Sequence, residues 1–422
     1  MPYVLGIDIG TGSTVVAVSR LHRGTWSEPQ AVAVDTGSDI AGDVLRRVGD
    51  DVPLVLGGRP YHASTLTAEV VDEVVSRVEA AEGQPAEGVV VAVPGTWGPH
   101  RTGLLREALW RAGVDGRVGP DGVALLAAPV AAVEGYAARE PVGVGDTIAV
   151  YALGGTHCEC SLVRRSGVAD FELLAGAETG EPTGGADFDD VLLQWVRARL
   201  ASDLDPADPQ VRLALSVLRQ RCTAAREELS ATESTTVRAL LPGGPTTVAV
   251  SRGGFEELIQ PLVGTTVETL LGVVGPGPVP DAVLLVGGAA RTPLVRRQVE
   301  SAVAGPVRMG DDPAHSVALG AACAARRLVA APDSVAAYRP AAAAGEGALS
   351  GVGDPGDPGA EPAYPPPRPP VVITALEAPR SRSARRAAGD RQPGARMALL
   401  ALAVLLIIVG VWLTVASGLG RA

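Results

Sequence analysis

The sequence predicts an α/β fold with mixed β-sheets over residues 1–330, because short runs rich in Val, Ile and Leu alternate with longer amphipathic segments. Two pairs of these apolar runs flank glycine-containing turns, and another run leads through glycines into a helical pattern. The runs typical of strands are 4–10, 13–19, 88–95, 147–155, 158–165 and 282–288. The segments with helical periodicity are 100–112, 187–200, 211–229, 292–303 and 313–327.

The composition is that of a protein able to bury a sizeable core, since 46% of the 422 residues are hydrophobic. Only 3% are aromatic, so Val, Leu and Ala must fill most of that core. All 36 basic residues are arginine, and therefore no mechanism here can use a lysine. The net charge of −11 argues against a nucleic-acid partner. Four cysteines lie in apolar or mixed segments and indicate no disulfide framework.

The C-terminal part has a different composition. Residues 331–396 are rich in Ala, Gly and Pro, which predicts an unfolded linker, serving either as a spacer or as a proline-rich ligand. Residues 397–420 carry no charge, and at ~1.5 Å per residue they can cross a hydrocarbon core of ~30 Å. Arginines concentrate just before this run. We therefore expect a single transmembrane helix in the lipid bilayer, with the folded domain 1–330 in the cytoplasm.

The first glycine-containing turn joins the first two predicted strands. Small residues at Gly10, Thr11 and Gly12 let backbone N–H groups approach a phosphate. Asp8 precedes them and is placed to hold Mg²⁺ through a water molecule. Many hairpins contain a turn of this kind, so it points to a phosphate site only together with the other turns.

Two further turns have similar features. The second lies between strands and comprises Gly154, Gly155 and Thr156. The third lies at a strand-to-helix junction and comprises Gly287, Gly288, Ala289 and Arg291. At the third turn, glycines allow an adenosine to approach the backbone, and the arginine could stack on the base. Three such turns in this order predict a nucleotide site.

The order of these motifs resembles the nucleotide-binding domain of DnaK-type heat-shock chaperones, within the actin and sugar-kinase superfamily. The resemblance covers roughly residues 3–328, and its most diagnostic match is the segment TGGADFDD at 183–190. It implies two lobes, each built on a ribonuclease-H-like sheet, with ATP or ADP and Mg²⁺ in the cleft between them. It also implies a peptide-binding half for which this chain has a linker and an apolar run instead.

The resemblance implies further residues in the cleft. Gly184, Gly185 and Asp187 belong to the segment that lines the cleft floor in the family. Arg226 and Ser230 match the basic residue and the serine of the helix that faces adenosine.

Several positions depart from the family pattern. Ala152 stands where the family has an aspartate before the second phosphate loop, and Ala128 stands where it has a glutamate. The catalytic lysine is absent, with Arg59 as a nearby candidate substitute. Losses of preorganised groups of this kind commonly cost about 10²–10³ in rate each. We therefore expect very slow ATP hydrolysis or none.

Three residues are candidates for a catalytic role. Asp8 is the carboxylate that survives most securely, and Glu159 stands where the family has an aspartate of the second loop. His157 is a candidate replacement base, because a neutral histidine beside a phosphate loop can accept a proton. The alternative is that His157 is a strand-end residue without a catalytic role.

Three functions remain open at this stage. The first is a membrane-tethered DnaK-like protein that binds ATP or ADP, with a chaperone-like or regulatory role and weak or absent hydrolysis. The second is a nucleotide-free scaffold that binds an unknown protein partner at the membrane. The third is a slow chaperone-type ATPase.

Overall fold

The computed structural model describes residues 1–10, 13–34, 41–118, 122–167, 170–200, 207–241 and 244–330. All of these residues belong to one unit of the chain, Met1–Ser350. The predicted linker 331–396 and the predicted transmembrane helix 397–420 lie outside the described residues. Among the helices of the described part, none has both the length and the apolarity needed to span a bilayer.

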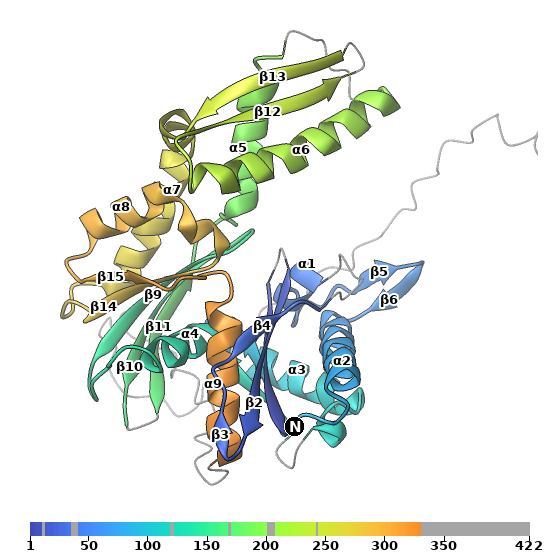
Figure 1. Cartoon of the computed structure of the whole chain (residues 1–422), viewed down its shortest axis with the longest axis vertical. Helices are drawn as coiled ribbons and strands as arrows, with labels where there is room; N and C mark the ends of the chain where they lie inside the picture. Colours follow the sequence, from blue (N-terminus) through green and yellow to red (C-terminus); the bar gives the residue numbers. More distant parts are fainter. Residues whose placement is uncertain are drawn as a thin grey trace, which may run out of the picture. The chain divides into compact units, whose positions relative to one another are not determined.

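The first lobe contains a six-stranded sheet with the strand order β3-β2-β1-β7-β8, in which β4 also pairs with β2 (Figure 1). Strand β1 pairs antiparallel with β2 and parallel with β7. The strands are β1 Tyr3–Ile9, β2 Thr14–His22, β3 Thr25–Trp26, β4 Gln30–Val32, β7 Gly88–Val93 and β8 Val123–Ala127. The lobe also contains α1 Ala41–Arg46, the hairpin β5 Leu54–Leu56 and β6 Arg59–Tyr61, α2 Ala63–Glu82, α3 Pro99–Arg111 and a 3₁₀ turn at Asp115–Arg117.

The second lobe contains a five-stranded sheet with the order β11-β10-β9-β14-β15. Its strands are β9 Thr147–Leu153, β10 Cys158–Arg165, β11 Phe171–Glu178, β14 Ala282–Val286 and β15 Val307–Met309. Its helices are α5 Gly185–Arg197, α6 Pro209–Leu229, α7 Arg252–Val274 and α8 Pro293–Ala302, with a 3₁₀ turn at Gly288–Arg291 before α8. The hairpin β12 Ser234–Leu241 and β13 Gly244–Ser251 packs against α6.

The two sheets repeat one pattern. In each, a central strand pairs antiparallel with the next strand in sequence and parallel with a later strand, as β1 does in the first lobe and β9 in the second. This repeated order agrees with the two similar lobes that the resemblance implies. The mixed α/β class predicted from the alternation of apolar runs is therefore confirmed.

Two helices, α4 Ala128–Ala137 and α9 Ser316–Ala330, pack against each other and join the lobes. A core cluster contains residues of both helices and of strands from both sheets, including Val4, Val90 and Val150. The helices approach so closely that a Cβ atom on Gly320 would overlap the carbonyl oxygen of Ala131. A glycine is therefore required at this crossing.

The predicted helix 313–327 starts later than expected, at Ser316. Residues 313–315 form a turn instead, in which the His315 N–H donates to the Asp312 carbonyl.

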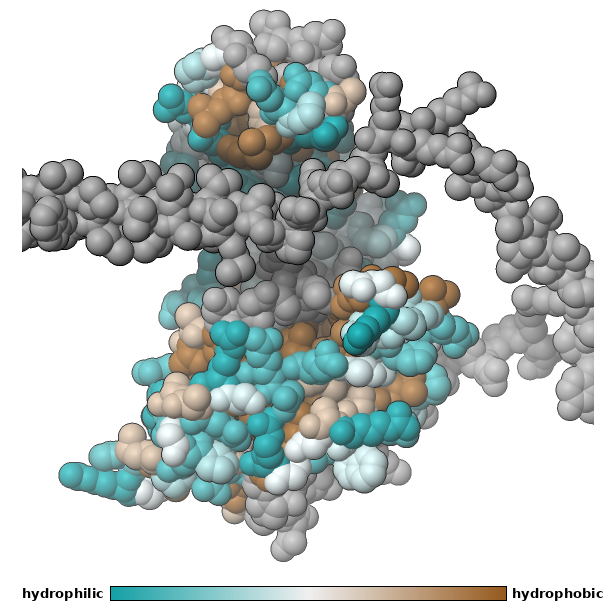
Figure 2. Space-filling model, turned by 90° about the vertical axis from the view of Figure 1, so that its right-hand side faces the viewer, coloured by the Kyte–Doolittle hydropathy of each residue, from teal (hydrophilic) through white to brown (hydrophobic). Residues whose placement is uncertain are grey.

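On the face drawn in Figure 2, hydrophilic and hydrophobic residues are interspersed.

Candidate functional site

A cavity of about 690 Å³ lies where β1, β7, β9 and β14 end at their carboxyl termini. Residues of both lobes line it, which is the usual position of ligand sites in open α/β sheets. The lining includes most of the residues predicted from the three turns, namely Asp8, Gly10, Gly154, Gly155, Thr156, Gly287, Gly288, Ala289 and Arg291. The structure therefore brings together three turns that are far apart in the sequence.

The first turn closes tightly between β1 and β2. The N–H of Gly10 donates to the carbonyl of Ser13 at 3.1 Å, and both residues line the cavity. Thr11 and Gly12 lie outside the described residues. Burial raises the pKa of Asp8 to about 6, although its side chain borders the cavity. A cation placed beside Asp8 would favour the ionised carboxylate.

The second turn is held in place by the start of α5. The Gly185 N–H donates to the Gly154 carbonyl at 3.0 Å, and the Ala186 N–H donates to the Gly155 carbonyl at 2.7 Å. A Cβ atom on Gly184 would lie 2.6 Å from the Thr156 nitrogen, so only glycine fits beneath this turn. Gly184 thus acts by packing, whereas Gly185 lines the cavity.

His157 follows this turn and also lines the cavity. Its Nδ1 is 2.7 Å from the Thr156 Oγ1, so the hydroxyl orients the ring. The Gly154 N–H donates to the carbonyl of His157 at 2.9 Å and closes the turn. Both predicted readings of His157 remain compatible with this position.

Asp187 has a different role from the one predicted. Its carboxylate accepts a hydrogen bond from the Gly184 N–H at 2.8 Å and caps α5, and Asp187 is not among the residues that line the cavity. The carboxylate of α5 that reaches the cavity is Asp189, one helical turn beyond Gly185. Residues four apart share a helix face, and this spacing could have identified Asp189 from the sequence.

Arg226 of α6 lines the cavity, and so does Ser230, which directly follows this helix. Arg226 donates through Nε to Asp189 at 2.6 Å, and this ion pair is buried, with 10% and 9% of the two side chains exposed. Thr223 also donates to Asp189, at 2.9 Å. This wall of the cavity therefore carries an internally neutralised arginine.

The third turn contains two glycines with different roles. Gly287 has φ of 92°, and a Cβ atom there would overlap the Leu153 carbonyl oxygen, so this glycine is required by the packing of β14 on β9. Gly288 has open space, since an added Cβ would meet only the Ala314 Cβ at 3.8 Å. Arg291 lines the cavity, and its guanidinium is ion-paired with Asp312.

The positions that depart from the family pattern also face the cavity. Ala128 and Ala152 both line it, so methyl groups face the cavity at the two positions where the family pattern has carboxylates. Arg59 lies exposed in β6 and is not among the residues lining the cavity. The arginine that enters the cavity from the first lobe is Arg46 of α1, which sequence reasoning missed.

Glu159 lies buried in the cavity wall, 7% exposed. It accepts hydrogen bonds from the Gly95 N–H at 2.9 Å and from the Ser161 hydroxyl at 3.2 Å. Burial, followed by repulsion from Glu178, raises the pKa of Glu159 to about 7. In the described part of the chain, no group of three or more His, Cys, Asp or Glu side chains could hold a metal ion.

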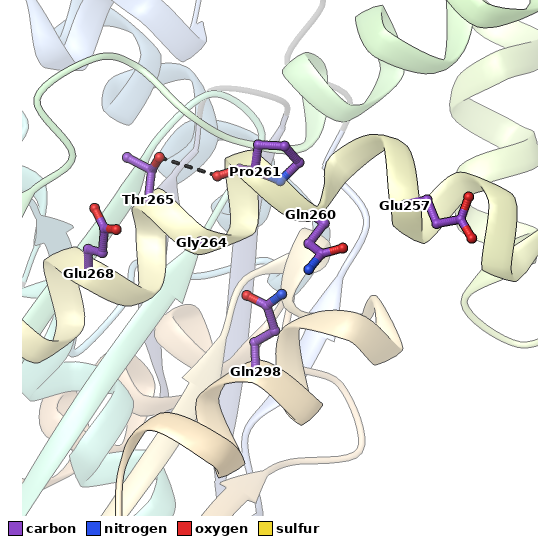
Figure 3. A pocket seen from close by; sticks show the side chains of 7 residues that line it. All are labelled: Glu257, Gln260, Pro261, Gly264, Thr265, Glu268 and Gln298. Atoms are coloured by element: carbon purple, nitrogen blue, oxygen red, sulfur yellow. Dashed lines mark hydrogen bonds between the residues drawn. The ribbon is translucent and has the colours of Figure 1, made fainter.

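A second, smaller pocket of about 510 Å³ lies on α7 beside α8. Figure 3 shows Gln260 and Gln298 pointing toward one another across it, with Glu257 and Glu268 along α7. The groove lies away from the strand ends that converge on the larger cavity, and its lining residues include no arginine or histidine. The larger cavity is therefore the candidate site.

Two lobes of the same sheet order, with a cavity at their strand ends, are consistent with an actin-like ATPase domain. Residues 11–335 match the family model described as Hsp70 protein, and the chain belongs to this family. It is similar to the chaperone protein DnaK of Metamycoplasma hominis, with 26% identity over 353 residues, covering 76% of this chain and 58% of that protein. The DnaK of Elusimicrobium minutum is 27% identical over 369 residues, covering 76% and 57%. The chain thus spans somewhat more than half the length of these relatives.

Proposed function

We propose that this Hsp70-family protein binds ATP or ADP in the cavity between its lobes and hydrolyses ATP slowly or not at all, in a chaperone-like or regulatory role. The observation that carries the proposal is the convergence of three glycine-containing turns on one cavity at the strand ends. Its volume of about 690 Å³ falls within the ~300–1,000 Å³ usual for small-molecule and cofactor sites.

The lining supports one orientation of the nucleotide. The glycines Gly10 and Gly155 leave room for phosphates close to the backbone, and the open space at Gly288 suits the base and ribose. Mg²⁺ fits as a partner of the phosphates, with Asp8 reaching it through water, because this cation usually keeps several waters and is held by one or two carboxylates plus phosphates. The bound nucleotide supplies the phosphoryl group, and the protein residues position it.

Slow hydrolysis follows from the groups that face the phosphates. Ala128 and Ala152 offer no carboxylate, and no lysine is present. Glu159 has a pKa of about 7, so near neutral pH about half of it is protonated and unable to accept a proton. Catalysis by positioned charges is therefore weakened at several places at once.

A titration of the full chain in detergent with ATP and with ADP tests nucleotide binding. The wild type is expected to bind both with similar affinity, because most contacts go to adenosine and the first turn. Gly288→Val is expected to abolish binding by filling the open space, with an unchanged melting temperature. Gly272→Val, on an open face of α7, is the matched control. Equal affinity in the Gly288→Val variant would contradict the proposed site.

We also propose that residues 397–420 anchor the protein in a membrane, with the folded domain in the cytoplasm. The uncharged run and the arginines before it support this proposal. Deleting residues 397–422 is expected to move the protein from the membrane fraction to the supernatant. A deletion variant that still sediments with membranes would contradict the anchor.

One observation favours the alternative of a scaffold that binds a protein partner without nucleotide. Within the described part of the chain, each of the three arginines that line the cavity is already ion-paired with a carboxylate of the protein. A wild-type chain that releases no heat on titration with either nucleotide would support the scaffold.

A further inference from the structure

The three arginines that line the cavity differ in how strongly the protein holds them. The Arg226–Asp189 pair is buried, with only 10% and 9% of the side chains exposed. Arg46 pairs with Glu178 at 2.7 Å, with 23% and 29% exposed. Breaking a buried pair leaves an uncompensated charge away from water, whereas a partly exposed pair contributes little net stability. Arg46 is therefore easier to release to a ligand than Arg226.

The Arg46–Glu178 pair also joins the two lobes. Arg46 ends α1 in the first lobe, and Glu178 ends β11 in the second. Glu178 accepts a further hydrogen bond from the Thr96 hydroxyl at 2.7 Å, and Thr96 follows β7 of the first lobe. One carboxylate of the second lobe thus holds two side chains of the first.

A second carboxylate strengthens the same junction. Glu159 lies directly opposite Glu178 across the β10–β11 pair, and it accepts the Gly95 N–H at 2.9 Å. The side chains of Arg46, Thr96, Glu159 and Glu178 and the backbone of Gly95 form what we call the interlobe clasp. Like charges facing each other across strands are unfavourable, and Arg46 is the cation that compensates them.

Arg46 has access to two anions in this arrangement. It lines the same cavity as Asp8, Gly10 and Gly155, where the phosphates are proposed to lie. A phosphate offers a planar guanidinium several acceptor oxygens and more negative charge than one carboxylate. Glu178 and a phosphate therefore compete for the same guanidinium.

We propose that Glu178 holds Arg46 in the nucleotide-free protein, and that the phosphates of a bound nucleotide weaken the interlobe clasp by taking Arg46 from Glu178. This inference rests on the proposed nucleotide site. Adenosine, which has no phosphate, leaves the clasp closed. Nucleotide binding thereby replaces one contact between the lobes, the Arg46–Glu178 ion pair, with a contact between Arg46 and phosphate.

The affinity test uses full chains carrying Glu178→Gln, Arg46→Gln or the control Glu172→Gln. Glu172 also lies on β11, but it pairs with Arg164 on the exposed face. Glu178→Gln is expected to raise ATP affinity about threefold to fivefold, because ATP then no longer has to break a partly exposed ion pair to bind Arg46. Arg46→Gln is expected to lower ATP affinity, and adenosine affinity is expected to stay constant in all variants.

A second measurement needs no nucleotide. Fluorophores attached at Val55→Cys and Leu213→Cys, both exposed, report the distance between the lobes. Without nucleotide, Glu178→Gln and Arg46→Gln are expected to shift the energy transfer toward the value that ATP produces in the wild type. Glu172→Gln is expected to leave it unchanged.

The outcomes separate this inference from the proposed function. If the wild type binds ATP and Glu178→Gln changes neither ATP affinity nor the interlobe distance, the clasp is wrong and the nucleotide site stands. If no variant binds ATP, both the nucleotide site and the phosphate exchange are wrong.

Discussion

Replacing Glu159 with glutamine is expected to remove most of the pH dependence of stability that this buried carboxyl produces. In the folded protein its pKa is raised from 4.5 to about 7, chiefly by burial and then by Glu178. The folded state therefore binds a proton more tightly than the unfolded state. The stabilisation is fully present below about pH 4.5 and is lost as the pH rises through about 7.

The size of the effect follows from the shift. The rise of the pKa from 4.5 to about 7 means that ~3.4 kcal/mol of unfolding free energy is lost between low and high pH. About 2.5 kcal/mol of this falls between pH 5 and pH 8, since the unfolded carboxyl is already partly ionised at pH 5. Relaxation of the buried site in solution lowers the value, so ~2.5 kcal/mol is an upper bound.

The assay is urea unfolding of wild type and Glu159→Gln at pH 5 and pH 8, with linear extrapolation to water. The wild type is expected to lose more stability than the variant over this range, and the difference between the two isolates Glu159 from Asp8. Glutamine can still accept the Gly95 N–H, so the junction is retained. Glu172→Gln, at an exposed ion pair, serves as the control. Parallel pH profiles for wild type and Glu159→Gln would refute the reasoning.

Three further changes test the fold and the site. Gly320→Ala is expected to lower the free energy of unfolding in urea by about 3 kcal/mol or more, because the added methyl group meets the backbone of α4. The control Gly272→Ala, on an open helix face, is expected to cause no loss of stability. Asp187→Ala is expected to cost about 1 kcal/mol by removing the cap of α5, while ADP affinity measured by titration stays within about twofold. Ala152→Asp is expected to leave phosphate release in a steady-state assay as slow as in wild type, since the missing groups act as a unit; a large gain would show that one carboxylate suffices.

The sequence alone predicts the strands and turns because their signals are local. Apolar runs and the glycines between them identify the ends of β1, β9 and β14, and the structure brings those three ends to one cavity. The order of these motifs was also sufficient for the resemblance that the family match later confirmed. Residues 331–422, for which the sequence predicts a linker and a membrane helix, lie outside the described structure.

The tertiary structure decided which neighbouring residue performs each role. Asp187 and Asp189 are two positions apart, but only Asp189 faces the cavity, because the start of α5 sets the direction of every side chain that follows. The glycine requirement at Gly287 comes from the carbonyl of Leu153, more than a hundred residues earlier in the chain.

The arginine that could replace the missing lysine was likewise decided by the tertiary structure. The sequence offers Arg59 as a candidate replacement for the missing lysine, whereas the structure places Arg46 in the cavity. Glu178, on the other lobe, holds that arginine. Local sequence carries no information about contacts between segments 132 residues apart, because only the packing of the two sheets through α4 and α9 brings those segments together.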